Sequence, residues 1–348
     1  MIEVKAQPLR IYIERGDQLQ QLNCDFLLQN HGSIFLQLDT IEVSIFDHRD
    51  LLVVRRVLDT HAISPSIAIL GTTKLAPDSA LTIFNPFHTF PSDIPLHHLR
   101  YRFALTNEEG ESAALVEVSV QPIMYETKAD LTLPVRGRLI VWDGHDFYAH
   151  HRRVALTHPL IRELGVQALT GRYAYDFDLI DEQGALYRGD GMANEDWFGF
   201  GVPILAPADG TVVAIEAALA DNDVGAPSFD FATAARHDLR RINGNYVVLD
   251  HFTGEYSLLC HLMQNSVIVR PGQYVHQGQP IARMGNSGAT THIHLHYELA
   301  DGYDMYHSEG VPAYFRRFQR LRGSQAKQVD VGILDTGEII ESTVPLAG

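Results

Sequence analysis

The sequence predicts a mainly β protein with an immunoglobulin-like β-sandwich in its N-terminal part and an antiparallel β domain in its C-terminal part. Its 348 residues are enough for about two domains with full hydrophobic cores. Over residues 1–125, short segments alternate apolar and polar residues between turn signals, which is typical of a sandwich. Near the end, His292, His294 and His296 alternate with apolar residues, so an extended strand would carry three imidazoles on one face.

Composition and charge narrow the classes of partner. Hydrophobic residues make up 45% and charged residues 20%, as in ordinary globular proteins. Lys and Arg number 27 against 43 Asp and Glu, and the net charge of −16 opposes binding to nucleic acid or to an anionic membrane. No run of about 18 apolar residues occurs, so we expect no membrane insertion. No signal-peptide pattern opens the chain, which predicts a cytoplasmic protein as written; a trimmed periplasmic or secreted protein would look the same.

The N-terminal segment, residues 1–125, shows no cluster of catalytic residues. Its alternating stretches include residues 41–45 and 101–105, and its histidines, such as His88, are interpreted as loop residues. The two cysteines, Cys24 and Cys260, are too far apart in sequence to form a disulfide framework. We therefore expect this domain to be an interaction module for a protein partner.

A second domain is predicted over residues 126–325, followed by a C-terminal strand and tail over residues 326–348. An apolar strand at its start runs directly into a His-rich segment, residues 144–153. Within that segment, His150 and His151 are candidates for a metal or substrate loop, or are simply exposed beside two arginines.

Further along this domain, the sequence predicts an acidic strand, an insertion and a late helix. Residues 172–179 alternate apolar and acidic residues, which places Asp176 and Asp178 on one strand face. Carboxylates beside a histidine column suit zinc, although Asp178 alone is expected to be solvated. Residues 216–241 look like an insertion that walls a groove, and residues 312–321 look helical.

A series of motifs in this domain agrees in order and spacing with one known family. The motifs are Asp176, residues 202–212, Gly244-Asn245, Cys260-His261-Leu262, residues 269–272, Gly278-Gln279, residues 285–288 and His294-Leu295-His296. Together they resemble the lysostaphin-type (LytM-like) peptidoglycan zinc metalloendopeptidase domain, over about residues 170–300.

The resemblance implies an antiparallel β groove that holds Zn²⁺ through a His, an Asp and the second His of a His-x-His pair. Asp176 and His296 match ligands, whereas His261 and His294 match the two histidines that move the proton and stabilise the oxyanion. The chemistry is consistent, because zinc polarises a carbonyl and lowers the pKa of water while an imidazole carries the proton.

One ligand position departs from the family pattern. The first ligand should be a His four residues before Asp176, but this position holds Arg172, which cannot bind zinc because its guanidinium stays protonated. His151 is the preferred replacement, followed by His150 and then His292.

The sequence thus predicts a zinc-dependent endopeptidase acting on peptide cross-links of peptidoglycan or a related peptide. The alternative is a catalytically inactive relative that binds cell-wall peptide or activates an amidase.

Overall fold

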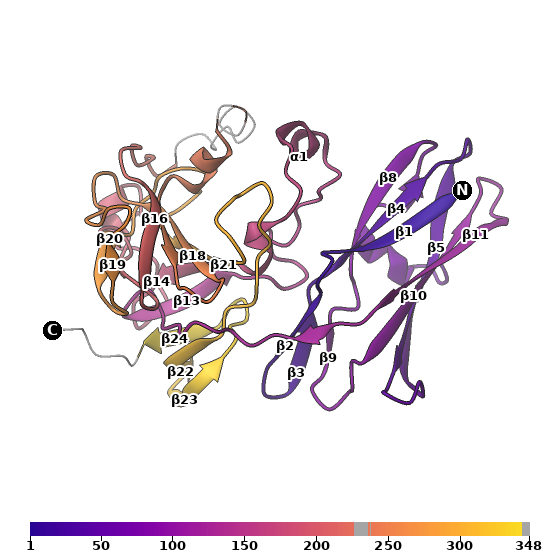
Figure 1. The fold of residues 1–348 in the computed structure, drawn as a ribbon, viewed down its shortest axis with the longest axis horizontal. Coiled ribbons are helices and arrows are strands. Elements are labelled where there is room, and N and C mark those ends of the chain that lie inside the picture. Colours follow the sequence, from indigo (N-terminus) through magenta and orange to yellow (C-terminus); the bar gives the residue numbers. More distant parts are fainter. Residues whose placement is uncertain (226–235, 237, 343–348) are drawn as a thin grey trace. The chain divides into compact units, whose positions relative to one another are not determined.

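The computed structural model describes residues 1–225, 236 and 238–342 of the chain. The chain divides into two compact units (Figure 1): an N-terminal unit of residues 1–125 with 155–159, and a C-terminal unit formed by the rest. Helices are short: α1 (Pro159–Leu164) and the 3-10 helices η1 (Ser66–Leu70), η2 (Thr170–Tyr173), η3 (Asn194–Asp196) and η4 (Leu239–Asn243). Among the described residues, no helix has the length and apolar character needed to cross a lipid bilayer.

Two antiparallel sheets of the N-terminal unit share one hydrophobic core. One has the order β1-β4-β8 and the other the order β11-β10-β5-β6, with β7 paired to β5. Their strands are β1 (Ile2–Gln7), β4 (Asp25–Asn30), β5 (Leu36–Phe46), β6 (Leu52–Asp59), β7 (Lys74–Leu75), β8 (Ser79–Phe84), β10 (His98–Thr106) and β11 (Ser112–Val120). Phe26 of one sheet packs against Tyr101 and Phe103 of the other, and all three are fully buried. The facing sheets agree with a sandwich, and its immunoglobulin-like class stays a prediction.

A third sheet completes the N-terminal unit. Its order is β12-β2-β3-β9, and β12 pairs with β2 in parallel. The strands are β2 (Tyr12–Arg15), β3 (Leu19–Leu22), β9 (Thr89–Pro91) and β12 (Ile123–Met124).

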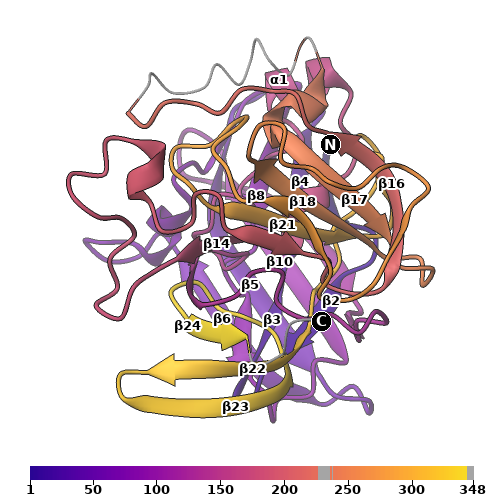
Figure 2. The same cartoon turned by 90° about the vertical axis from the view of Figure 1, so that its left-hand side faces the viewer.

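A ten-stranded antiparallel sheet forms the frame of the C-terminal unit (Figure 2). Its order is β19-β16-β17-β18-β21-β14-β13-β24-β22-β23, and β15 and β20 form a separate pair. The strands are β13 (Arg138–Asp143), β14 (Tyr175–Leu179), β15 (Pro203–Leu205), β16 (Gly210–Glu216), β17 (Asn245–Asp250), β18 (Tyr256–Leu262), β19 (Tyr274–Val275), β20 (Pro280–Arg283), β21 (Leu295–Ala300), β22 (Phe315–Arg322), β23 (Gln325–Gly332) and β24 (Ile339–Ser342).

Strand β14 lies inside this sheet, between β21 and β13. Side chains alternate between the two faces of a strand, and on one face the rings of Tyr175 and Phe177 pack on Phe315. Asp176 points the other way, and the register places it opposite both His296 of β21 and Asp143 of β13. The apolar face therefore anchors the sheet, while the opposite face collects polar side chains.

Three sequence expectations for this unit were wrong. Residues 312–321 are not helical: Phe315–Arg322 is strand β22, and the positive φ of Arg317 interrupts its alternation, so Phe315 and Phe318 are both buried at a spacing that resembles a helix. Asp178 is fully buried because β14 is an interior strand.

The expected histidine strand is also shorter than predicted. Strand β21 begins at Leu295, so His292 and His294 precede it rather than continuing the column. The insertion predicted at residues 216–241 lies partly outside the described residues.

Candidate metal and catalytic site

Three histidine side chains contact the carboxylate of Asp176. His151 Nε2 lies 3.3 Å from Asp176 Oδ2, and His296 Nδ1 lies 3.0 Å from Asp176 Oδ1. His294 Nε2 lies 3.4 Å from that same Oδ1 atom. The carboxylate thus has an imidazole nitrogen on each of its oxygens, and all four side chains are buried.

His151 reaches the site from the segment that links β13 to α1. It is 8% exposed and bonds through Nδ1 to the carbonyl oxygen of Gly144, so this nitrogen carries the proton and Nε2 is free to bind a metal ion. The loop therefore brings His151, the replacement ligand preferred from the sequence, next to Asp176.

Two neighbours of His151 belong to the same cluster. Ligand atoms of Asp143, His150, His151 and Asp176 all lie within 4.8 Å of one another. The side chain of His150, however, is 71% exposed and pairs with Asp143, whereas that of His296 is 11% exposed and contacts Asp176 directly. Burial and contact favour His151, Asp176 and His296 as the metal-binding set, with His150 and Asp143 beside it.

These three residues have the donor types that a zinc ion takes, and two of their donor distances can be compared with a zinc site. Zinc takes nitrogen and carboxylate ligands at about 2.0–2.2 Å, and the corners of a tetrahedron of that size are about 3.3–3.6 Å apart. The distances from Asp176 to His151 and His296, 3.3 and 3.0 Å, are close to this spacing.

Arg172 occupies the position where the family pattern has its first ligand. It is 1% exposed and forms an ion pair with Glu309, whose other oxygen accepts a hydrogen bond from the Leu169 amide. The guanidinium is therefore a buried structural group that offers no donor to a metal ion.

His261 enters the site through an irregularity of strand β18. The register between β17 and β18 shifts next to it, and its backbone has φ of 59°, a left-handed conformation rarely adopted by residues other than glycine. Bulges of this kind redirect side chains beside active sites. The ring lies 4.8 Å from that of His294 and 5.7 Å from that of His296, measured between centroids.

Hydrogen bonds to carbonyl groups define the proton positions on the two catalytic candidates. His261 Nδ1 donates to Ser287 O at 2.9 Å, and His294 Nδ1 donates to His292 O at the same distance. Each ring therefore keeps its Nε2 atom for chemistry at the site.

The surroundings of Asp176, His296 and His261 shift the pKa of each of these three groups. Burial alone would raise the pKa of Asp176, but the charges of His151 and His294 hold it well below the usual range. Burial opposes charge on His296, yet its hydrogen bonds to Asp176 and Glu298 raise its pKa to about 10. Burial and neighbouring imidazoles lower the pKa of His261 well below normal, which favours a neutral ring able to accept a proton.

The pKa values of His151 and His294 shift in opposite directions, although both side chains are buried. Burial lowers the pKa of His151, and the nearby charge of Asp176 only partly compensates. For His294, the charge of Asp176 outweighs burial and raises the pKa, so this ring favours the protonated form.

Glu298 is a site residue that was not predicted from the sequence, and Asp178 is buried rather than solvated as expected. Glu298 Oε1 accepts a hydrogen bond of 2.9 Å from His296 Nε2, which orients the ring. Period-two alternation along β21 would have found it, since it follows His296 by two residues. Asp178 lies 2.9 Å from His292 Nε2, so His292 pairs with Asp178 rather than with the metal-binding set.

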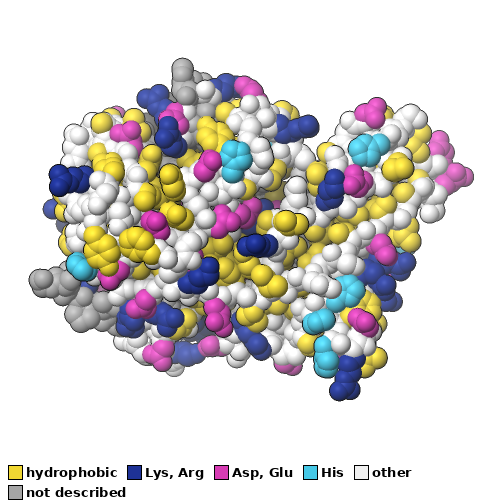
Figure 3. All heavy atoms as spheres, viewed as in Figure 1, with side chains coloured by type: hydrophobic (Ala, Val, Ile, Leu, Met, Phe, Trp, Pro, Cys, Tyr) yellow, Lys and Arg dark blue, Asp and Glu magenta, His cyan; other side chains and the backbone are white. Residues whose placement is uncertain are grey.

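On the face drawn in Figure 3, Lys and Arg side chains are scattered among acidic and uncharged groups and form no basic patch. Fold and site together thus bring His151, Asp176 and His296 into one buried cluster, with His261 and His294 beside it. The cluster consists of the imidazole and carboxylate groups that zinc sites in proteins use.

Comparison with known proteins identifies the domain. Residues 196–307 match the family model described as Peptidase family M23, so the C-terminal unit carries an M23 domain and the family resemblance is confirmed. The matched segment contains His261, His294 and His296, whereas Asp176 and His151 precede it.

Curated relatives match short stretches of the chain. An "Uncharacterized metalloprotease" of Haemophilus influenzae is 36% identical over 101 residues, which is 28% of this chain and 16% of that protein. "Peptidoglycan DD-endopeptidase ShyA" of Vibrio cholerae is 45% identical over 56 residues, covering 16% of this chain and 13% of the relative. The chain therefore spans less than a fifth of either relative's length.

Solved structures include the catalytic domain of lysostaphin from Staphylococcus simulans, at 20% identity and a TM-score of 0.23. That match covers 36% of this chain and 88% of the lysostaphin domain.

Proposed function

We propose that this protein is a zinc-dependent endopeptidase that hydrolyses peptide cross-links of peptidoglycan or a related peptide. The M23 domain and the named peptidoglycan endopeptidase relative support the class of reaction. The observation that carries the proposal is the contact of His151 with Asp176, because it supplies a third donor beside His296 despite Arg172.

A zinc ion held by His151, Asp176 and His296 would polarise the scissile carbonyl and lower the pKa of water. The chain's own residues then handle the proton. His261 is the general base, because its Nδ1 donates to Ser287 O and its Nε2 has a free lone pair for the proton of the attacking water.

His294 has the complementary task. Its Nδ1 is fixed by His292 O, and its Nε2 faces the centre of the site, 3.4 Å from Asp176. A protonated Nε2 there donates a hydrogen bond to the oxyanion that forms when water adds to the carbonyl carbon. When the C–N bond breaks, the proton taken by His261 passes to the leaving amine.

The proposal is tested by metal content and by hydrolysis together. Purified protein should hold about one zinc per chain, and the His296→Ala variant should lose it. With zinc bound, the protein should release soluble peptide fragments from isolated cell-wall sacculi. Fresh protein without metal, or zinc-loaded protein that releases nothing, would contradict the proposal.

Arg172 favours a second candidate function, a cell-wall-binding or amidase-activating module without its own catalysis. Its buried pairing with Glu309 supports this candidate, because a structural residue then stands where the family pattern has its first ligand. Zinc-loaded protein that sediments with sacculi but leaves them intact would favour this function.

A further inference from the structure

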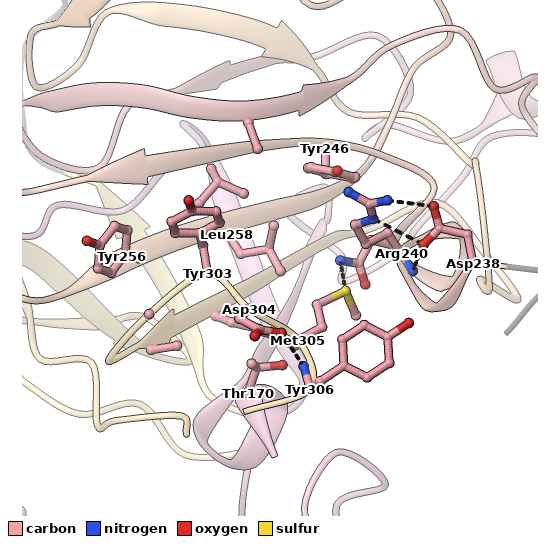
Figure 4. A pocket seen from close by; sticks show the side chains of 16 residues that line it. Thr170, Asp238, Arg240, Tyr246, Tyr256, Leu258, Tyr303, Asp304, Met305 and Tyr306 are labelled. Atoms are coloured by element: carbon pink, nitrogen blue, oxygen red, sulfur yellow. Dashed lines mark hydrogen bonds and ion pairs between the residues drawn. The ribbon is translucent and has the colours of Figure 1, made fainter. Parts of the chain in front are cut away.

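A pocket of about 390 Å³ lies on the sheet of the C-terminal unit, over strands β16, β17, β18 and β21 (Figure 4). Glu298 and Ala300 of β21 line it, and they follow His296 by two and four residues. Because alternate residues of a strand share one face, the pocket opens on the same face of the sheet as the catalytic candidates. It therefore extends the site along β21.

The floor of this pocket is aliphatic and its walls are rich in tyrosine. Ala214, Val248 and Leu258 come from three neighbouring strands and provide apolar surface. Tyr256 and Tyr303 lie together at one end, with ring centroids 5.6 Å apart, as Figure 4 shows. Such a surface suits methylene groups and a cation that lies over the face of an aromatic ring.

Four charged side chains line the pocket, and two of them neutralise each other. Asp238 and Arg240 form a bidentate pair, with distances of 3.0 and 2.9 Å between their polar atoms. Asp304 accepts from His307 Nδ1 at 2.7 Å. The other oxygen of Asp304 accepts from the Tyr306 amide at 2.9 Å, so both carboxylate oxygens of Asp238 and of Asp304 are already engaged.

Glu298 is different, because only one of its oxygens is engaged. Oε1 accepts from His296 Nε2, whereas Oε2 has no hydrogen-bond partner within the described part of the chain, although the residue is only 6% exposed. A buried carboxylate oxygen without a donor is costly, and a donor from a ligand would remove the cost.

We propose that this pocket binds the aliphatic primary amine of a diamino-acid side chain in the peptide substrate, an inference that rests on the proposed peptidase function. The ammonium donates to Glu298 Oε2, and its methylene stem packs on the aliphatic floor between the tyrosines. Since Glu298 Oε1 holds His296, the amine-bearing residue sits next to the catalytic centre and contributes to the choice of scissile bond.

Binding of two matched peptides tests this site without any need for hydrolysis. The probes are N-acetyl-Ala-Lys-Ala-amide and the same peptide with its lysine amine acetylated, titrated by calorimetry into the zinc-loaded His294→Ala protein. The free amine should bind about tenfold more tightly, because a hydrogen bond to a charged partner is worth more than a neutral one.

Two further variants of the His294→Ala protein separate the contribution of the Glu298 charge from that of the tyrosine surface. Glu298→Gln keeps an oxygen for His296 but removes the charge, so the two peptides should bind within about twofold of each other. Tyr303→Ala should weaken both peptides. Its matched control is Tyr274→Ala, which removes a similarly exposed tyrosine from β19, outside the pocket, and should change neither.

Equal affinities in the starting protein, or a preference that survives Glu298→Gln, would overturn the amine site. Its failure is separable from that of the peptidase: release of fragments from sacculi without amine preference rejects only the pocket proposal. Amine preference without release rejects only the hydrolytic function.

Discussion

Replacing His151 by alanine should weaken zinc binding far more than replacing its neighbour His150. His151 Nε2 is 3.3 Å from Asp176 Oδ2, and its side chain is 7% exposed. Loss of a residue that merely orients a ligand costs about 10–100-fold in metal affinity. Loss of a ligand should therefore cost at least about 100-fold, which corresponds to about 2.7 kcal/mol of binding free energy.

His150→Ala is the matched control for this experiment. Its ring adjoins that of His151, with centroids 4.0 Å apart, but its side chain is 71% exposed and bonds to Asp143. The control should lower the affinity by less than about tenfold, because an exposed side chain that neither binds the metal nor orients a ligand should cost less than the about 10–100-fold of an orienting residue.

Zinc affinity is measured by equilibrium competition with a chromophoric chelator at pH 7.5, and circular dichroism verifies that both variants are folded. If His151→Ala binds as the parent does, the third donor lies elsewhere and the reasoning from geometry is refuted. If His150→Ala loses as much as His151→Ala, both belong to the metal set.

Further predictions concern stability, catalysis and pH. Arg172→Ala leaves Glu309, whose side chain is only 18% exposed, without its cationic partner, and should lower the free energy of unfolding, measured by urea denaturation, by about 3 kcal/mol. The exposed control Arg316→Ala should lower it by less than about 1 kcal/mol. His261→Ala should retain its metal but release sacculus fragments about 10²–10⁴-fold more slowly; loss of metal as well would contradict its role as base. Burial lowers the pKa of His251 in the folded state, so the stability that the neutral ring contributes is present above pH about 6.5 and is lost as the pH falls. His251→Asn should therefore make the melting temperature fall less steeply on the acid side. An unchanged slope would contradict the role of His251 in acid unfolding.

His251 illustrates the physical cause of that pH dependence. Its Nδ1 donates to Asp209 O at 2.8 Å, and its Nε2 accepts from the Ser257 hydroxyl at 2.7 Å. Protonation of Nε2 removes that acceptor inside the protein, whereas the unfolded chain takes up the proton freely. Acid therefore favours unfolding.

Short sequence patterns were enough to predict several residues of the candidate site. His294 and His296 lie two residues apart next to a Gly-rich turn, and Asp176 alternates with apolar residues, so their residue types and spacing are visible without a structure. Glu298 follows the same alternation, two residues after His296, so it could have been predicted from the sequence. The tyrosine-lined pocket around its unbonded oxygen could not, because side chains from several strands and loops form that pocket.

The sequence by itself determined a mainly β chain, the M23 resemblance and the absence of a ligand at Arg172, since these follow from alternation and short motifs. The sequence left His151, His150 and His292 as candidates for the missing ligand, and the tertiary structure places His151 beside Asp176. His151 precedes Asp176 by 25 residues in a segment without regular periodicity, and the pairing of Arg172 with Glu309 spans 137 residues. Contacts of this kind depend on how the loops fold onto the sheet, and no local pattern records them.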